Sequence, residues 1–200
     1  MQLDTDLTGL FGITLAIFTL LVRVRRVQAL QTRQRASVLL AAIVALSIPL
    51  WGVSLAGFVR GMTGDLSITT LLLLTLASVR SLSGKVPVGE ENRFAMLKAT
   101  AIAAVLFYPF ALGFSMFDPY RLGYGNLWFM AALLVLAIWS SLRYSTFFAV
   151  CIALGVAAWG VGWYESPNLW DYLLDPWLAV YALAVQLKTG LARWRGRKHA

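Results

Sequence analysis

The sequence has very few residues that bind metals or carry redox chemistry. Its 200 residues include one cysteine, Cys151, and one histidine, His199. One cysteine excludes an intrachain disulfide, and because Cys151 lies within a long apolar run we expect it to be buried and unreactive. His199 lies in the basic C-terminal tail, so the bundle interior has no imidazole for haem or zinc. We therefore expect no metal site and no cofactor.

Charged residues are also scarce. They make up 13% of the chain, whereas hydrophobic residues make up 60% and the mean hydropathy is +0.73. An ordinary soluble domain is roughly 45–50% apolar and 25% charged. Apolar runs recur from Leu7 to Leu187 with only short polar interruptions. The composition therefore predicts one transmembrane domain over residues 1–200, folded as an all-α polytopic membrane helical bundle.

The apolar runs divide into about seven candidate spans. A spanning helix needs roughly 20 apolar residues. The third segment is short, and Pro49 and Pro109 are expected to interrupt two of the helices. The predicted spans are residues 7–22, 36–59, 66–79, 95–114, 127–142, 144–163 and 170–187.

The positions of the basic residues predict the orientation. A net charge of +8 is compatible with nucleic-acid binding, but these residues sit at the ends of apolar segments, where Lys and Arg mark cytoplasmic loops. With the N-terminus outside and the C-terminus cytoplasmic, only Arg60 and Arg121 of the 17 basic residues fall outside. If the third segment did not span, most of them would lie outside. We expect seven spans and no nucleic-acid partner.

The N-terminal segment is expected to remain as a span. Asp4 and Asp6 precede it and the first basic residue is Arg23, so it lacks the positive region of a cleaved signal peptide. A compact chain of this kind fits a multi-pass protein of the plasma (inner) membrane.

Most acidic residues map to the predicted outer face. Glu90 and Glu91 are the exceptions, whereas two outer loops, SMFDPYRLGYG and WYESPNLWDYLLDPW, hold most of the remaining acids. We expect these loops to form one site, with Arg121 within ion-pair or shared-ligand reach of at least one acid. The candidate outer-face residues are Asp118, Tyr120, Arg121, Tyr124, Glu165, Asn168, Asp171 and Asp175.

Several of these residues also fit purely structural roles. Asp118 precedes Pro119, which is the pattern of an N-cap followed by proline at the first helical position. In a continuous helix Asp171 and Asp175 would share one face. Alternatively, the last span begins at Pro176 and residues 170–175 form an interfacial turn. Both interpretations remain open at this point.

Three functions are compatible with these features. The first is a non-catalytic accessory or assembly partner of a cell-envelope process, with its functional loops on the extracytoplasmic face. The second is a small transporter or lipid translocator, and the third is an enzyme acting on a lipid-linked substrate at the outer face. The expected partners are membrane lipids and, for the first function, another membrane or envelope protein.

Overall fold

A computed structural model describes residues 2–50, 52–114, 116–143 and 145–198 of the chain. This part is almost entirely helical, as expected for an all-α protein, and its only sheet is a two-stranded hairpin. The helices are α1 (Gln2–Val22), α2 (Arg25–Gln28), α3 (Thr32–Ser47), α4 (Leu55–Thr63), α5 (Ile68–Ser83), α6 (Glu90–Ala111), η1 (Pro119–Gly123), α7 (Leu127–Arg143), α8 (Thr146–Gly160), α9 (Trp170–Leu173) and α10 (Pro176–Lys198).

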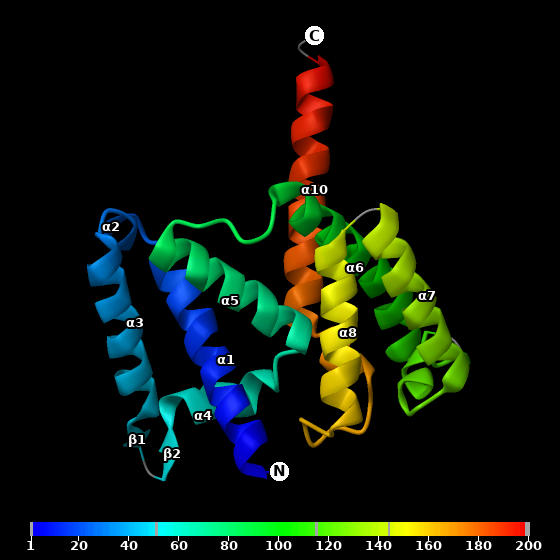
Figure 1. The fold of residues 1–200 in the computed structure, drawn as a ribbon, viewed down its shortest axis with the longest axis horizontal. Coiled ribbons are helices and arrows are strands. Elements are labelled where there is room, and N and C mark those ends of the chain that lie inside the picture. Colours follow the sequence, from blue (N-terminus) through cyan, green and yellow to red (C-terminus); the bar gives the residue numbers. More distant parts are fainter. Residues whose placement is uncertain (1, 51, 115, 144, 199–200) are drawn as a thin grey trace.

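The long helices run alternately up and down (Figure 1). In the described part of the chain, α1, α3, α5, α6, α7, α8 and α10 follow the order of the seven predicted segments. The N-terminus lies at one end of the bundle, and α10 carries the C-terminus beyond the other end (Figure 1). We call the first end, with α4 and residues 112–126 and 161–175, the acidic end. The opposite end, with residues 23–31 and 84–89, is the basic end.

The second predicted segment, residues 36–59, is not one helix. Helix α3 ends at Ser47, and strands β1 (Pro49–Leu50) and β2 (Val53–Ser54) form an antiparallel hairpin before α4 begins. Pro49 causes the break, because proline lacks an N–H and pushes the preceding residue out of helical conformation. Ile48 accordingly has an extended backbone, with φ −64° and ψ 123°. Pro109, by contrast, stays inside α6, close to its end.

Other boundaries also differ from the prediction. Helix α6 begins at Glu90, five residues before the predicted start, and the seventh segment divides into α9 and α10. The sixth segment was predicted to begin at Tyr144, which lies outside the described residues; α8 begins at Thr146 after the Ser145 side chain caps its first turn. The side chains of Asp4 and Asp6, and residue His199, also lie outside the described part.

The core consists of three groups of side chains between these helices. One group joins α6, α8 and α10 and includes Met96, Leu178 and Cys151, which is 1% exposed. The burial expected for Cys151 is therefore confirmed. A second group joins α1, α3 and α4 around Ile13 and Leu46. The third connects α7 and α8 to residues 164–172, and this group positions the acidic-end loops.

The outward faces of several helices are apolar. On α7, Trp128 is 83% exposed, and Leu134, Val135 and Leu142 are also exposed. Polar Thr100 and Ser140 are buried instead. By length and composition, one helix in the described part, Glu90–Ala111, could cross a membrane; shorter apolar helices are Leu7–Val22, Ile68–Ser83, Leu127–Arg143 and Thr146–Gly160.

Candidate functional site

The two loops predicted to form one site pack against each other at the acidic end. The indole N–H of Trp170 donates a 3.0 Å hydrogen bond to the carbonyl of Pro119. The backbone N–H of Leu169 donates to the carbonyl of Gly123 at 2.9 Å. A Cβ at Gly123 would lie 1.8 Å from Oδ1 of Asn168, so the loops approach this closely only because residue 123 is glycine. We call residues 118–124 and 164–172 the joined loops.

Asp171 lies at the centre of the joined loops. The hydroxyl of Tyr120 donates to its Oδ2 at 2.9 Å, and the hydroxyl of Ser166 donates to the same oxygen at 2.5 Å. Burial raises the pKa of Tyr120, and its hydrogen bond to the Asp171 carboxylate raises that pKa further. Tyr120 therefore keeps its proton and acts as a donor. One oxygen of the Asp171 carboxylate, Oδ2, thus accepts hydrogen bonds from two hydroxyl groups.

Asp118 and Asn168 act as local caps. The Oδ1 atom of Asp118 accepts from the backbone N–H of Tyr120 at 2.9 Å and begins η1, with Pro119 at its first position. This confirms the N-cap pattern in the sequence. The side chain of Asn168, fully buried, accepts from the N–H of Trp170 and donates to the carbonyl of Tyr120, each at 2.9 Å. Asn168 thus caps its own turn and holds the other loop.

Asp175 belongs to a different contact. Its Oδ1 accepts from the N–H of Leu178 at 2.8 Å, which caps α10. Its Oδ2 accepts from the N–H and hydroxyl of Ser67, at 2.9 and 2.7 Å, and from the hydroxyl of Thr70. Ser67 is the N-cap of α5, so one buried carboxylate joins the N-termini of two helices, whose dipoles favour a negative charge.

The helix break at Asp175 resolves the alternative left open by the sequence. Helix α9 ends at Leu173, Leu174 is extended, and α10 begins at Pro176. Residues 170–175 therefore form a separate turn, and the carboxylates of Asp171 and Asp175 do not share the face of one helix. The expectation of a continuous seventh segment from residue 170 is wrong, because the Asp-Pro pair starts a new helix.

Arg121, Tyr124 and Glu165 are the exposed members of the predicted set. Among the described residues, Arg121 forms no ion pair with Asp118, Glu165, Asp171 or Asp175, so the expected ion pair is absent. The ion pair at this end instead joins Nε of Arg60 to Oδ1 of Asp65 at 2.6 Å. The Tyr124 ring lies edge-on to Tyr120, with 5.8 Å between centroids.

Aromatic residues missed by the sequence reasoning complete the joined loops. Trp170 lies between Phe107 and Phe129, at centroid distances of 4.4 and 4.6 Å. The Tyr172 hydroxyl accepts from the N–H of Tyr164 at 3.0 Å, and the Tyr164 hydroxyl donates to the carbonyl of Leu66 at 2.8 Å. The density of aromatic residues in WYESPNLWDYLLDPW was the only local signal of this packing.

Three of the four acids in the predicted set accept hydrogen bonds from the protein, and the fourth, Glu165, is exposed. Asp118, Asp171 and Asp175 each accept hydrogen bonds from the protein. Within the described ranges, no group of three or more His, Cys, Asp or Glu side chains is placed to hold a metal ion. The groups left facing outward are Arg121, Tyr124 and Glu165, beside exposed Leu112, Phe114 and Met116.

A groove lined by α1, α5 and α10 lies apart from the joined loops. Its volume is about 410 Å³, and it lies between α1, α5 and α10, extending to residues 86–88 at the basic end. Leu73, Leu74 and Ile17 form part of its apolar wall, and Arg23, Arg80 and Arg93 line the same groove. Such a volume falls within the roughly 300–1,000 Å³ of small-molecule sites.

No protein-family model, curated protein or solved structure matches this chain.

Proposed function

We propose that this chain is a multi-pass protein of the plasma (inner) membrane with seven helical spans. The acidic end faces outside, and the basic end faces the cytoplasm. The alternating helices and the opposite positions of the termini support this arrangement (Figure 1). The apolar side chains on the outer face of α7 also support it, because a helix in water normally presents polar residues there.

The shorter helices fit a thin or locally adapted bilayer. Helix α5 has 16 residues and α8 has 15, or about 24 and 22 Å at 1.5 Å per residue. A bilayer core is about 30 Å thick, and a short span is accommodated by thinning the bilayer or by interfacial residues at its ends. Trp163 beyond α8 and Trp177 at the start of α10 are suitable anchors.

Within that membrane, the chain acts as a non-catalytic accessory or assembly partner of a cell-envelope process. The observation that carries this proposal is the exposed apolar residues Leu112, Phe114, Met116 and Phe117, which precede the joined loops in the chain. Phe114 is 82% exposed and Met116 is fully exposed, and Arg121 and Tyr124, a few residues later in the chain, are also exposed. Aromatic, Met and Arg side chains are enriched in protein interfaces. The joined loops, which carry Arg121 and Tyr124, are held together by internal hydrogen bonds.

Site-specific photo-crosslinking in cells tests the partner proposal. A photoreactive residue at Met116 or Tyr124 should give a discrete adduct with one membrane or envelope protein. The same residue at Leu134, on the outer face of α7, is the control and should give lipid adducts only. Asn168→Ala, which removes the side-chain hydrogen bond from Asn168 to the carbonyl of Tyr120 and so weakens the contact between the two loops, should reduce the protein adduct at both test positions. Lipid adducts alone at all three positions would contradict the proposal.

Lipid transport is the second candidate function. The groove between α1, α5 and α10 favours it, because an apolar wall with arginines suits an amphiphile. An enzyme acting on a lipid-linked substrate has less geometric support. Asp175 is 4% exposed and Oδ2 of Asp171 accepts two hydroxyl hydrogen bonds, so both carboxylates already have structural roles.

A further inference from the structure

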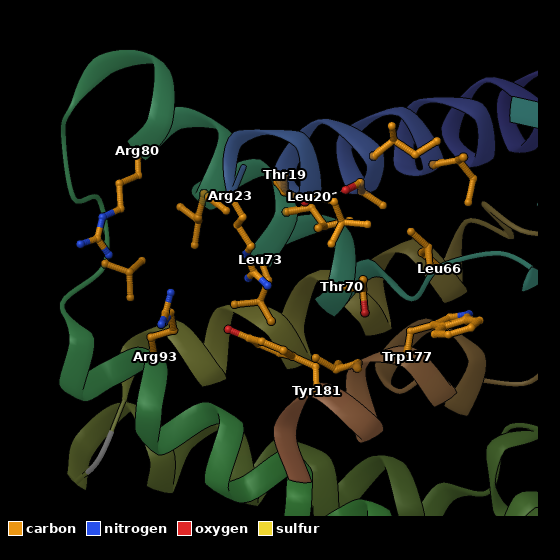
Figure 2. A pocket seen from close by; sticks show the side chains of 18 of the residues that line it. Thr19, Leu20, Arg23, Leu66, Thr70, Leu73, Arg80, Arg93, Trp177 and Tyr181 are labelled. Carbon is orange, nitrogen blue, oxygen red and sulfur yellow. Dashed lines mark hydrogen bonds between the residues drawn. The ribbon is translucent and has the colours of Figure 1, made fainter. Parts of the chain in front are cut away.

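The side chains that line the groove between α1, α5 and α10 change from apolar at one end to basic at the other. Figure 2 shows Leu66 and Trp177 at one end, Leu73 in the middle, and Arg80 and Arg93 at the other end. The wall formed by α5 from Thr70 to Arg80 is about 15 Å long at 1.5 Å per residue. The groove is therefore apolar over most of its length and positively charged at the basic end.

The arginine end has an excess of positive charge. Arg23, Arg80 and Arg93 line it, and Glu90 is the acidic residue among the lining side chains. Glu90 binds both neighbours, Arg80 Nη1 at 2.5 Å and Arg93 Nη2 at 3.4 Å. The hydrogen bond from Arg80 lowers the pKa of Glu90, which therefore remains ionised. One carboxylate against three guanidinium groups leaves two positive charges at this end.

Arg23 is positioned for an anion rather than for a protein carboxylate. Its guanidinium carbon lies 6.0 Å from the centroid of the Tyr181 ring, and the side chain extends into the groove toward that ring (Figure 2). Among the described residues, Arg23 forms no ion pair and the Tyr181 hydroxyl forms no hydrogen bond. A guanidinium over the face of a ring and a phenolic O–H can both donate to one phosphate group.

We propose that the groove binds one anionic phospholipid of the cytoplasmic leaflet, with its phosphate at Arg23 and Arg93 and an acyl chain along α5. This inference rests on the membrane orientation proposed above, which brings the basic end to the cytoplasmic leaflet. Charge complementarity selects the occupant, because basic pockets between spanning helices on that side recognise anionic headgroups. A zwitterionic lipid has the same acyl chains but lacks the net charge that the arginines complement.

Native mass spectrometry of the detergent-purified full chain tests the proposal. The probes are phosphatidylglycerol and phosphatidylcholine with identical acyl chains. The wild-type chain should bind phosphatidylglycerol more tightly. The double variant Arg23→Gln, Arg93→Gln should weaken that binding by about tenfold or more, because each arginine near an anionic headgroup contributes several-fold. Arg26→Gln, an exposed arginine outside the groove, is the matched control and should bind like wild type.

A second pair of variants tests the acyl-chain part. Ala77→Trp places a large side chain in the groove, whereas Ala184→Trp adds the same side chain on an exposed position of α10 outside it. The first variant should lose phosphatidylglycerol binding with all arginines intact, and the second should retain it. This pair keeps the test decisive if the double arginine variant does not fold.

Four results would overturn the proposal. The first is that the wild-type chain binds the two lipids equally, and the second is that Arg26→Gln loses as much phosphatidylglycerol binding as the double variant. The third is that Ala77→Trp retains phosphatidylglycerol binding. The fourth is that inorganic phosphate competes for the site as effectively as phosphatidylglycerol does. The last result would indicate a phosphate site without a lipid. Topology reporters that retain the proposed orientation while the lipid test fails would reject this inference alone. Reporters that place both termini on one side would reject the proposed function itself.

Discussion

The carboxylate of Asp175 accepts hydrogen bonds from four groups on two helices while it is almost completely buried. Replacing it leaves the N–H and hydroxyl of Ser67 and the hydroxyl of Thr70 without their charged acceptor. Buried donors that lose a partner are costly because water cannot replace it. At the scale of single residues, we expect the Asp175 carboxylate to stabilise the fold and not to take part in catalysis.

Asp175→Asn should lower the free energy of unfolding by about 2–3 kcal/mol, the usual value of a hydrogen bond to a charged group. The amide retains one acceptor but turns an NH₂ group toward existing donors. Glu165→Gln, on the exposed side of the same segment, is the control and should change stability by less than about 0.5 kcal/mol. Thermal unfolding in detergent measures both. Equal stability of the two variants would show that the Asp175 contacts contribute little.

Cys151 provides a second prediction at this scale. It is 1% exposed within the group of α6, α8 and α10 side chains, and a thiol in apolar surroundings is unreactive. Cys151→Ala should therefore preserve the in vivo phenotype, and a membrane-impermeant maleimide should not label the wild-type thiol in intact cells. Rapid labelling, with an introduced cysteine at exposed Glu165 as the positive control, would contradict the observed burial.

The residue-scale predictions succeeded where the interaction is local. Asp118 caps the N–H of Tyr120 two residues later, and this pairing follows from the Asp-Pro pattern alone. Long-range partners were not predictable in the same way. Tyr120 and Asp171 are 51 residues apart, and no periodicity specifies which hydroxyl meets which carboxylate. Arg121 was expected to pair by charge, yet its position in η1 leaves it exposed.

At the scale of elements, the two internal prolines have different outcomes. Pro49 separates α3 from a hairpin and α4, whereas Pro109 remains within α6. Apolar composition alone could not distinguish them, because residues 36–59 are as hydrophobic as a continuous span requires. The nearby Gly52, with φ +88°, provides the left-handed conformation that a tight turn needs. Together, Pro49 and Gly52 were the local signal for the hairpin.

Gly123→Ala tests how the two acidic-end loops fit together. The added methyl group would lie 1.8 Å from Oδ1 of Asn168, so the loops must separate, at a cost of about 1–3 kcal/mol. We expect a lower unfolding temperature and faster limited proteolysis within residues 161–169. Gly160→Ala is the control at the same end of the molecule, because nothing lies within 4 Å of its added Cβ. Identical proteolysis of both variants would contradict this account of the close approach.

At the scale of the whole molecule, the long helices of the described residues follow the order of the apolar segments predicted from the sequence, although the second and seventh segments are each divided. Hydrophobicity is averaged over many residues, so a prediction of helix order from it does not depend on the exact residue at which each helix begins or ends. The basic groove was not predictable, because Arg23, Arg80 and Arg93 each appeared to be an ordinary loop residue. Only the packing of α1, α5 and α6 around the groove brings them together.

Topology reporters test the proposed orientation. Fusions after residue 200 and insertions near Val86 should report cytoplasm, whereas insertions near Asp118 and Ser166 should report the outside. The expectation follows from the alternating helices and from the concentration of arginines at the basic end. A reporter after residue 200 on the same side as one preceding Gln2 would exclude an odd number of spans.

The contact of Asp175 with Ser67 has a consequence for how the molecule is made. The two residues are 108 positions apart, so during synthesis α5 must wait for nearly the whole chain before its first turn receives this acceptor. Until α10 arrives, the N–H of Ser67 and the hydroxyl of Thr70 lack their charged acceptor, at a cost that favours recognition by chaperones or proteases. Nascent chains truncated before residue 175 should therefore be short-lived compared with chains that include α10.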